Sequence, residues 1–169
     1  LRGVHELSTL WEFHLVIQVD QDIPIDARAM LEGPAALNWE STDGEVDSPF
    51  FGVVKEIELL DALPGHWIHY RLVMVSNLWF LSQVFRSRVF IDVSVPDVVD
   101  QILGDAGFEV GTDYTWSLAS RDAYSARDTI VQYHESDFDF LSRLLEHEGI
   151  FFYSHADGDH ERWMFADRN

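Results

Sequence analysis

Residues 130–153, IVQYHESDFDFLSRLLEHEGIFFY, carry the clearest structural pattern in the chain. Ser136 is a suitable N-cap for a helix, and Asp139 follows three residues later, as in a shortened capping box. Gly149 predicts the helix end, because glycine tolerates the left-handed backbone that commonly ends helices. The apolar residues between them fall at helical spacing: Phe138, Leu141, Leu144 and Leu145. The pattern therefore predicts an amphipathic helix with one buried stripe.

Strands are expected on both sides of this helix. Thr129–Tyr133 precedes it and Ile150–Tyr153 follows it. Asp157-Gly158 is a two-residue hairpin signal, and Trp163–Phe165 is then the returning strand. The C-terminal segment is thus predicted to alternate between helix and strand.

An earlier helix begins near Ser94. Ser94 is the predicted N-cap, with Pro96 in the first turn and Asp97 at the third helical position. Gly107 is a plausible stop. The apolar residues again follow helical spacing: Val95, Val98, Val99 and Ile102. Residues 111–127 show little pattern and are expected to form a loop.

The first half of the chain is typical of strands. Trp11–Val19 alternates between apolar and polar residues, and Gly52 marks a bulge or a close approach of two backbones. Further strands are expected at Ala35–Trp39, Phe50–Leu60 and His69–Val75, with turns at Ser41–Gly44 and Pro64-Gly65, a short helical turn at Asp26–Leu31 and a helical stripe at Asn77–Phe85.

These patterns predict a mixed β and α+β protein with two domains. Residues 1–92 are expected to form a β-barrel-like domain, whose first strands are expected to precede residue 1. Residues 93–169 are expected to form an α+β domain with two helices and a C-terminal hairpin. The abrupt ends of the sequence suggest a fragment.

Composition excludes several functions. The chain has 11 Lys and Arg against 30 Asp and Glu, a formal net charge of -19, so nucleic acid and anionic membranes are disfavoured partners. Cysteine is absent, which removes disulfides, thiolate metal sites and cysteine nucleophiles. No apolar run approaches the roughly 18 residues of a membrane span, and the first residues do not follow a signal-peptide plan.

Three groups of residues have the composition of a chemical site, and none is favoured as one. The first is the metal-like stretch His155, Asp157, Asp159 and His160, which is better explained as a polar hairpin turn. The second is the carboxylate set Glu135, Asp137, Asp139, Glu146 and Glu148, which suits the first turn and outer face of a helix better than a catalytic pair. The third is His66 and His69, which flank Trp67 near a turn. We therefore predict no catalytic residue, cofactor or metal, and no enzymatic activity.

Residues 130–153 closely resemble a hallmark segment of VgrG proteins, the spikes of bacterial type VI secretion, which are related to the hubs of contractile phage tails. Other stretches agree in the same order: Gly3–Phe13, Phe51–Val54, Leu78–Leu81, Arg86–Phe90 and Asp92–Val99. Val93 departs from the pattern, because lysine is usual there. The near absence of lysine also differs from many members, which affects surface charge more than fold.

The resemblance implies a mechanical role. Members of this family form homotrimers that join the Hcp tube to a needle tipped by a PAAR protein, and effectors are carried as extensions or cargo. By this resemblance the chain would be the N-terminal part of the spike hub, assembled in the bacterial cytoplasm and then injected. This piece alone is expected to trimerise weakly or not at all.

Three alternatives stay open at this point. The same fold could serve as a baseplate hub of a contractile phage tail, which the sequence barely distinguishes from a secretion spike. A hydrolase carried by a hub is a second alternative, although the motifs argue against it. The third is a generic protein-binding module, which would be a stable monomer with one exposed apolar patch.

Overall fold

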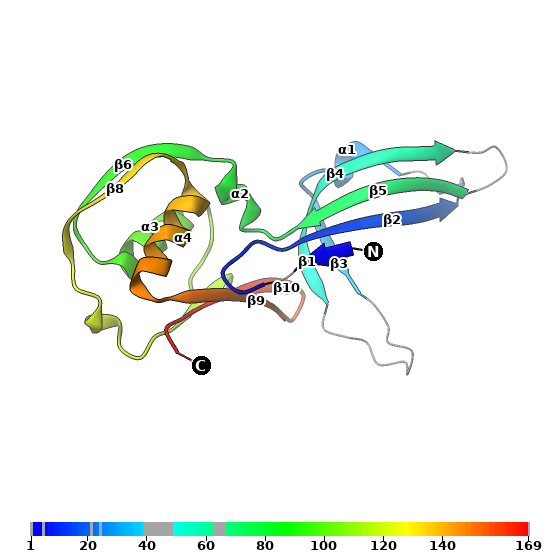
Figure 1. Cartoon of the computed structure of the whole chain (residues 1–169). Coiled ribbons are helices and arrows are strands. Elements are labelled where there is room, and N and C mark those ends of the chain that lie inside the picture. The colour runs from blue at the N-terminus through cyan, green and yellow to red at the C-terminus, as the bar shows by residue number, and fades with distance from the viewer. Residues whose placement is uncertain are drawn as a thin grey trace. The chain divides into compact units, whose positions relative to one another are not determined.

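The computed structural model describes residues 2–4, 6–20, 22–23, 25–38, 49–62 and 67–168. The chain divides into two compact units, which are described separately (Figure 1). The first unit comprises Leu1–Glu6, Leu10–Asn77 and Gly158–Glu161, and the second comprises Leu7–Thr9, Leu78–Asp157 and Arg162–Asn169.

The first unit is built on an antiparallel sheet with the strand order β1-β2-β5-β4-β3. The strands are β1 (Arg2–Val4), β2 (Glu12–Asp20), β3 (Pro34–Leu37), β4 (Phe50–Ala62) and β5 (Trp67–Val75). A short helix, α1 (Ala27–Met30), begins after Asp26, whose carboxylate caps it. Within the described residues β1 and β3 are the outer strands, so the expected barrel is an open sheet there.

The alternation predicted for Trp11–Val19 is confirmed in β2. Phe13 is buried and His14 is exposed, and the pattern continues along the strand. Trp11, Phe13 and Met74 form a buried apolar cluster in this unit. Gly52 is needed there, because a Cβ at this position would lie 2.1 Å from the carbonyl oxygen of Val75. The close approach predicted at Gly52 is therefore confirmed.

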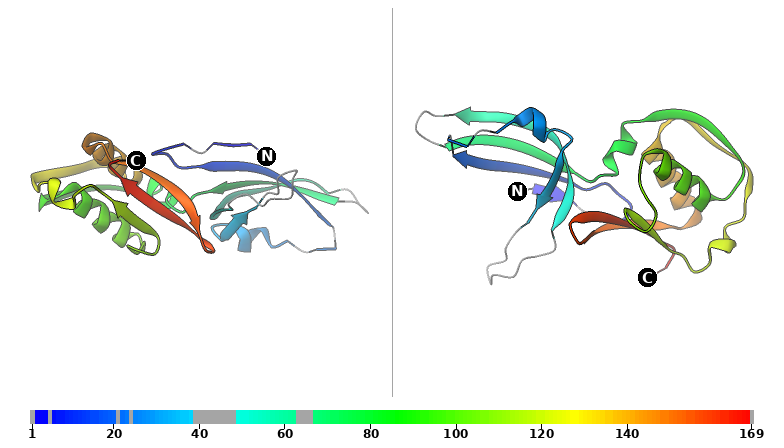
Figure 2. Two further views of the ribbon diagram at one scale, coloured as in Figure 1. Left: turned by 90° about the horizontal axis from the view of Figure 1, so that it is seen from below. Right: turned by 180° about the vertical axis from the view of Figure 1, so that it is seen from behind.

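The second unit contains two helices packed beneath a two-stranded ribbon (Figures 1 and 2). The ribbon pairs β6 (Phe85–Val93) with β8 (Arg127–Ser136). The helices are α3 (Val95–Asp105) and α4 (Asp137–Glu148). A second sheet has the order β7-β10-β9, and the remaining elements complete the unit: α2 (Trp79–Ser82), β7 (Tyr114–Ser117), the 3-10 helix Arg121–Ala123, β9 (Phe151–Asp157) and β10 (His160–Ala166).

Both predicted helix starts are confirmed. The Ser94 hydroxyl accepts from the backbone N–H of Asp97, and the Ser136 hydroxyl accepts from that of Asp139. Gly149 ends α4 with φ of 72°, the left-handed conformation expected of it. The predicted stripe of α3 is buried, as are Leu141, Leu144 and Leu145 of α4. Phe138 is only partly buried, and Phe140, which the predicted stripe did not include, is fully buried instead. The rings of Phe90 and Phe140 stack with their centroids 5.8 Å apart. The ribbon and the helices thus share one core.

The expected loop at 111–127 was wrong in part. Tyr114–Ser117 forms β7, which pairs in parallel with β10. A partner so distant in sequence leaves no local signal, so periodicity alone missed this strand. The hairpin turn falls at Gly158 and Asp159, one residue later than expected. The turns expected at 41–44 and 64–65 lie outside the described residues.

The two compact units meet in the sequence at Asn77 and Leu78, whereas the sequence pattern places the division after Asp92. The second of these points falls within β6, before its last residue. Because β6 pairs with β8, a cut after Asp92 would separate a strand from its hydrogen-bonded neighbour.

Candidate assembly surface

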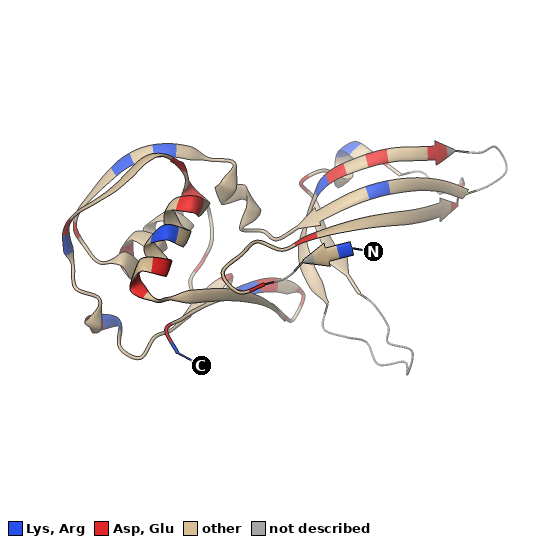
Figure 3. Cartoon of the chain, in the orientation of Figure 1, with Lys and Arg blue, Asp and Glu red and all other residues tan. Residues whose placement is uncertain are grey.

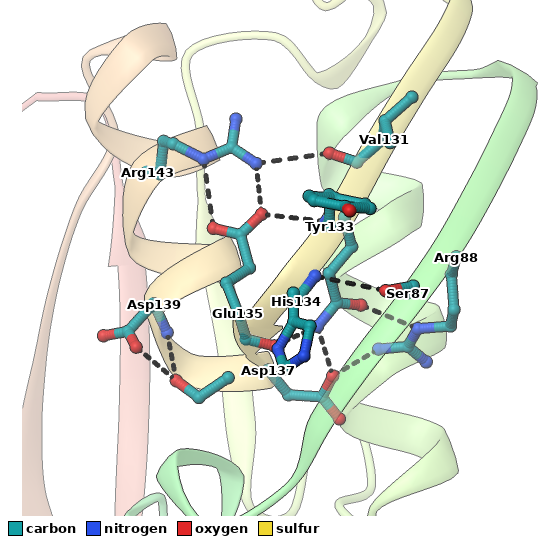
Figure 4. Close-up of polar contacts among 11 residues, drawn as sticks. Ser87, Arg88, Val131, Tyr133, His134, Glu135, Asp137, Asp139 and Arg143 are labelled. Carbon is teal, nitrogen blue, oxygen red and sulfur yellow. Dashed lines mark hydrogen bonds and ion pairs between the residues drawn. The ribbon is translucent and has the colours of Figure 1, made fainter.

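A buried polar cluster fixes the ribbon to the start of α4 (Figure 4). Arg88 and Gln132 lie opposite each other on β6 and β8, and Nε of Arg88 donates to Oε1 of Gln132 at 2.8 Å. Both side chains also donate to Oδ1 of Asp137, Arg88 at 2.6 Å and Gln132 at 2.8 Å. The side chain of Asp137 is only 4% exposed, so this carboxylate needs the positive charge of Arg88. Asp137 is therefore a structural anchor.

A second ion pair lies along the outer edge of β8. Arg143 of α4 contacts both carboxylate oxygens of Glu135, at 2.6 and 3.3 Å. Nη2 of Arg143 also donates to the carbonyl oxygen of Val131 at 3.2 Å, and the backbone N–H of Tyr133 points to Oε1 of Glu135 at 3.5 Å (Figure 4). Hydrogen bonding to Glu135 raises the pKa of Arg143 above its ordinary value. The two side chains thus occupy backbone groups that a neighbouring strand would otherwise use.

The other carboxylates considered from sequence are also separate. Asp139 completes the Ser136 cap, accepting from its hydroxyl at 2.6 Å. Glu148 pairs with Arg127, while Glu146 is exposed. These groups do not converge on one point. Glycoside hydrolysis by a pair of carboxyl groups would require two of them to face each other across a cleft.

The metal-like stretch is dispersed in the same way. Asp157 forms an ion pair with Arg162 at 2.5 Å, and Asp159 lies 3.4 Å from Nδ1 of His160. Within the described ranges no group of three or more His, Asp or Glu side chains is placed to hold a metal ion. His69 lies 2.7 Å from an exposed carboxylate of Asp61, and His66 is outside the described residues.

Residues 111–127 contact two carboxylates of α3, a cluster that the sequence did not reveal. Arg121 donates to Asp97 at 2.7 Å and to Asp100 at 2.6 Å. Asp100 also accepts from the hydroxyl of Tyr114 at 3.0 Å and from the indole of Trp116 at 2.8 Å. Hydrogen bonding to Arg121 lowers the pKa of Asp97 below its usual value. The cluster holds the loop against α3.

The outward side of the ribbon is apolar. We call it the ribbon face and define it by five exposed side chains: Phe85, Val89 and Ile91 of β6, and Val131 and Tyr133 of β8. Their exposed fractions run from 47% at Val131 to 78% at Tyr133. Charged residues occur elsewhere on the ribbon and on α4 (Figure 3). Clustered exposed apolar side chains are typical of surfaces that contact other proteins. The sequence patterns did not single out this face, because the pairing of β6 with β8 joins residues that lie far apart in the sequence.

A mostly β scaffold with two helices under a ribbon is a baseplate hub-like fold. The chain belongs to the phage tail baseplate hub (GPD) family, whose model matches residues 5–169. None of the helices in the described part of the chain is long and apolar enough to cross a membrane.

Relatives support the same family. The type VI secretion system spike protein VgrG1b of Pseudomonas aeruginosa is 32% identical over 90% of this chain, which spans 20% of that protein. The actin cross-linking toxin VgrG1 of Vibrio cholerae is 38% identical over 69% of this chain, or 10% of its own length. The chain thus spans a fifth or less of these two relatives.

Solved structures agree on the fold. The E. coli c3393 protein is described as a component of the type VI secretion system with similarity to T4 tail proteins gp27 and gp5. It superposes with a TM-score of 0.85 at 24% identity, over 98% of this chain and 44% of that one. The lidded Francisella PdpA-VgrG complex gives 0.70 at 12% identity, over 99% and 24%. The resemblance to VgrG and to phage hubs expected from residues 130–153 is confirmed.

Proposed function

We propose that this chain is the N-terminal hub portion of a homotrimeric spike in a type VI secretion machine. This role is supported by membership of the baseplate hub family and by sequence similarity to a protein named as a type VI spike. The observation that carries it is the cluster of Arg88, Gln132 and Asp137. In this cluster the buried polar groups of residues 130–153 hydrogen-bond the ribbon to the start of α4. Such use of buried polar groups favours a rigid load-bearing part over a reactive site.

In this proposal the sheet of the first unit contributes to a ring that contacts an Hcp-type tube protein. A needle, a PAAR-type tip and effectors would be engaged through other parts of the full-length protein. The hub would assemble in the bacterial cytoplasm and then be injected into the target cell. Two relatives with the word spike or toxin in their names favour a secretion machine over a phage tail.

The proposal is tested by capture of the tube protein. Full-length protein is immobilised and incubated with the Hcp-type protein from the same genome, and retained tube protein is quantified. Retention is expected, together with loss of tube protein from the culture medium when the gene is deleted. Absence of retention and unchanged release after deletion would overturn the proposal.

The alternative that the chain is a hydrolase is tested by an activity assay. We infer that the chain has no enzymatic activity of its own, because Glu135, Asp137 and Asp139, which the sequence offered as candidates, are separated in capping and ion pairs. Incubation with peptidoglycan or phospholipid should release no product. Turnover that is lost in a Glu135→Gln variant would contradict this inference.

A further inference from the structure

The two edges of the ribbon differ. On β8 the carbonyl oxygen of Val131 is occupied by Arg143, and the N–H of Tyr133 faces Glu135. These contacts also show which way the backbone points. The carbonyl of Val131 is directed away from β6, whereas the N–H of His134 is directed toward β6, where it donates to Ser87 at 3.1 Å.

This orientation fixes the backbone of β6. Opposed residues of an antiparallel pair alternate between those that exchange both hydrogen bonds and those that exchange none. Val131 lies opposite Val89, so that pair exchanges none, and the pair of Ile91 and Thr129 exchanges none either. The N–H and C=O groups of Val89 and Ile91 therefore point to the free edge of β6.

That edge is accessible. A groove of about 590 Å³ follows β6 from Arg88 to Val93 and reaches Gln101 of α3. The side chains of Val89 and Ile91 are 60% and 68% exposed. Within the described ranges, the outward backbone groups of these two residues have no hydrogen-bond partner. Unpaired groups on an edge strand are a template for another strand.

The charges near the free edge of β6 indicate which kind of added strand would bind there. Asp92 and Asp128 lie at the same end of the ribbon, because their neighbours Ile91 and Val93 pair with Thr129 and Arg127. Both carboxylates are exposed and neither has an ion-pair partner in the described part of the chain. By contrast, Arg88 is already neutralised by Asp105 and Asp137. Asp92 lines the end of the groove, and Asp128 lies near it on β8, so these negative charges favour a cationic partner.

We propose that the free edge of β6 binds an extended segment of a separate basic protein as an added strand. The segment pairs antiparallel with β6 through Val89 and Ile91, since antiparallel pairing is the more stable form. It carries apolar residues at alternate positions, which pack beside the exposed Val89 and Ile91. Its N-terminal end carries Arg or Lys, which meets Asp92 and Asp128. Strand addition of this kind takes affinity from the backbone and specificity from side chains.

The test uses the 169-residue chain and an acetylated peptide, RRTVTVTV, with EETVTVTV as the charge-reversed control. Amide hydrogen exchange is followed by NMR. At a peptide concentration ten times its dissociation constant, exchange at Val89 and Ile91 should slow by about tenfold. Exchange at Val131 and Tyr133 should not change. Equal protection by both peptides, protection on the β8 edge instead, or no protection at any concentration would overturn the proposal.

Matched variants separate binding from folding. Ile91→Pro removes an N–H from the free edge, and Thr129→Pro removes the opposed N–H on the β8 edge. Only Ile91→Pro should abolish peptide protection, while both should shift the thermal midpoint similarly. The double variant Asp92→Asn and Asp128→Asn leaves the backbone intact. It should weaken the binding of RRTVTVTV and reduce the difference in affinity between RRTVTVTV and EETVTVTV. An unchanged difference in affinity would contradict the role given to the two carboxylates.

Discussion

The indole N–H of Trp11 donates to Oε1 of Glu161 at 2.6 Å, across 150 positions of sequence. The other carboxylate oxygen accepts from the backbone N–H of Asn77 at 2.8 Å. Glu161 is 4% exposed, so its charge is buried together with these donors. The contact ties the segment Gly158–Glu161 to the core of the first unit, which explains why these few residues belong to that unit.

Removing this carboxylate should destabilise the first unit. Glu161→Ala leaves two donors unsatisfied, and a loss of about 1–3 kcal/mol in the free energy of unfolding is expected for each buried group left without a partner. Glu161→Gln keeps one acceptor and should cost less than Glu161→Ala. Urea unfolding followed by tryptophan fluorescence measures both, and equal stability of the two variants would argue against the hydrogen bonds as the cause.

Loss of Asp137 should destabilise the second unit. Asp137→Ala leaves the partly buried Arg88 and the buried Gln132 without their shared acceptor, and breaking a buried pair of this kind costs about 3–5 kcal/mol. Replacing both partners, as in Arg88→Met with Asp137→Leu, should cost less than the sum of the single changes. A double-mutant cycle in urea checks this, and strict additivity would show that the two residues are not coupled.

The pair Glu135 and Arg143 is expected to protect β8 from association. Arg143 is 54% exposed on its side chain, so Arg143→Ala should change stability by no more than about 1 kcal/mol. It frees the carbonyl of Val131, however, and should increase self-association. Sedimentation velocity over a concentration series measures this effect. Arg143→Lys is the control, and an Arg143→Ala variant that stays as monomeric as the parent would contradict the protective role.

Acid should weaken the cluster around Arg121. The pKa of Asp97 is held below its ordinary value of 3.8, chiefly by the hydrogen bond from Arg121. A depressed folded-state pKa contributes stability above the unfolded value and loses it as the pH falls through the folded value. The destabilisation caused by Arg121→Met should therefore shrink as pH drops below 3.8. Thermal midpoints of parent and variant across this range test the prediction; a constant difference would contradict it.

Local signals were enough to place several elements. Ser136 and Gly149 mark the start and the end of α4, and Ser94 marks the start of α3. These positions are predictable because capping depends on neighbouring residues. Non-local contacts were beyond such reasoning. Asp137 looks like an ordinary first-turn acid in sequence, yet it is buried by Arg88, 49 positions away. Strand β7 depends on β10 in the same way.

The most direct test of the hub proposal is the mass of the full-length protein in solution. Multi-angle light scattering at micromolar concentration should give three chains per particle for the full-length protein, while the 169-residue chain stays predominantly single. A full-length protein that behaves as a single chain at every concentration would contradict the proposed spike hub.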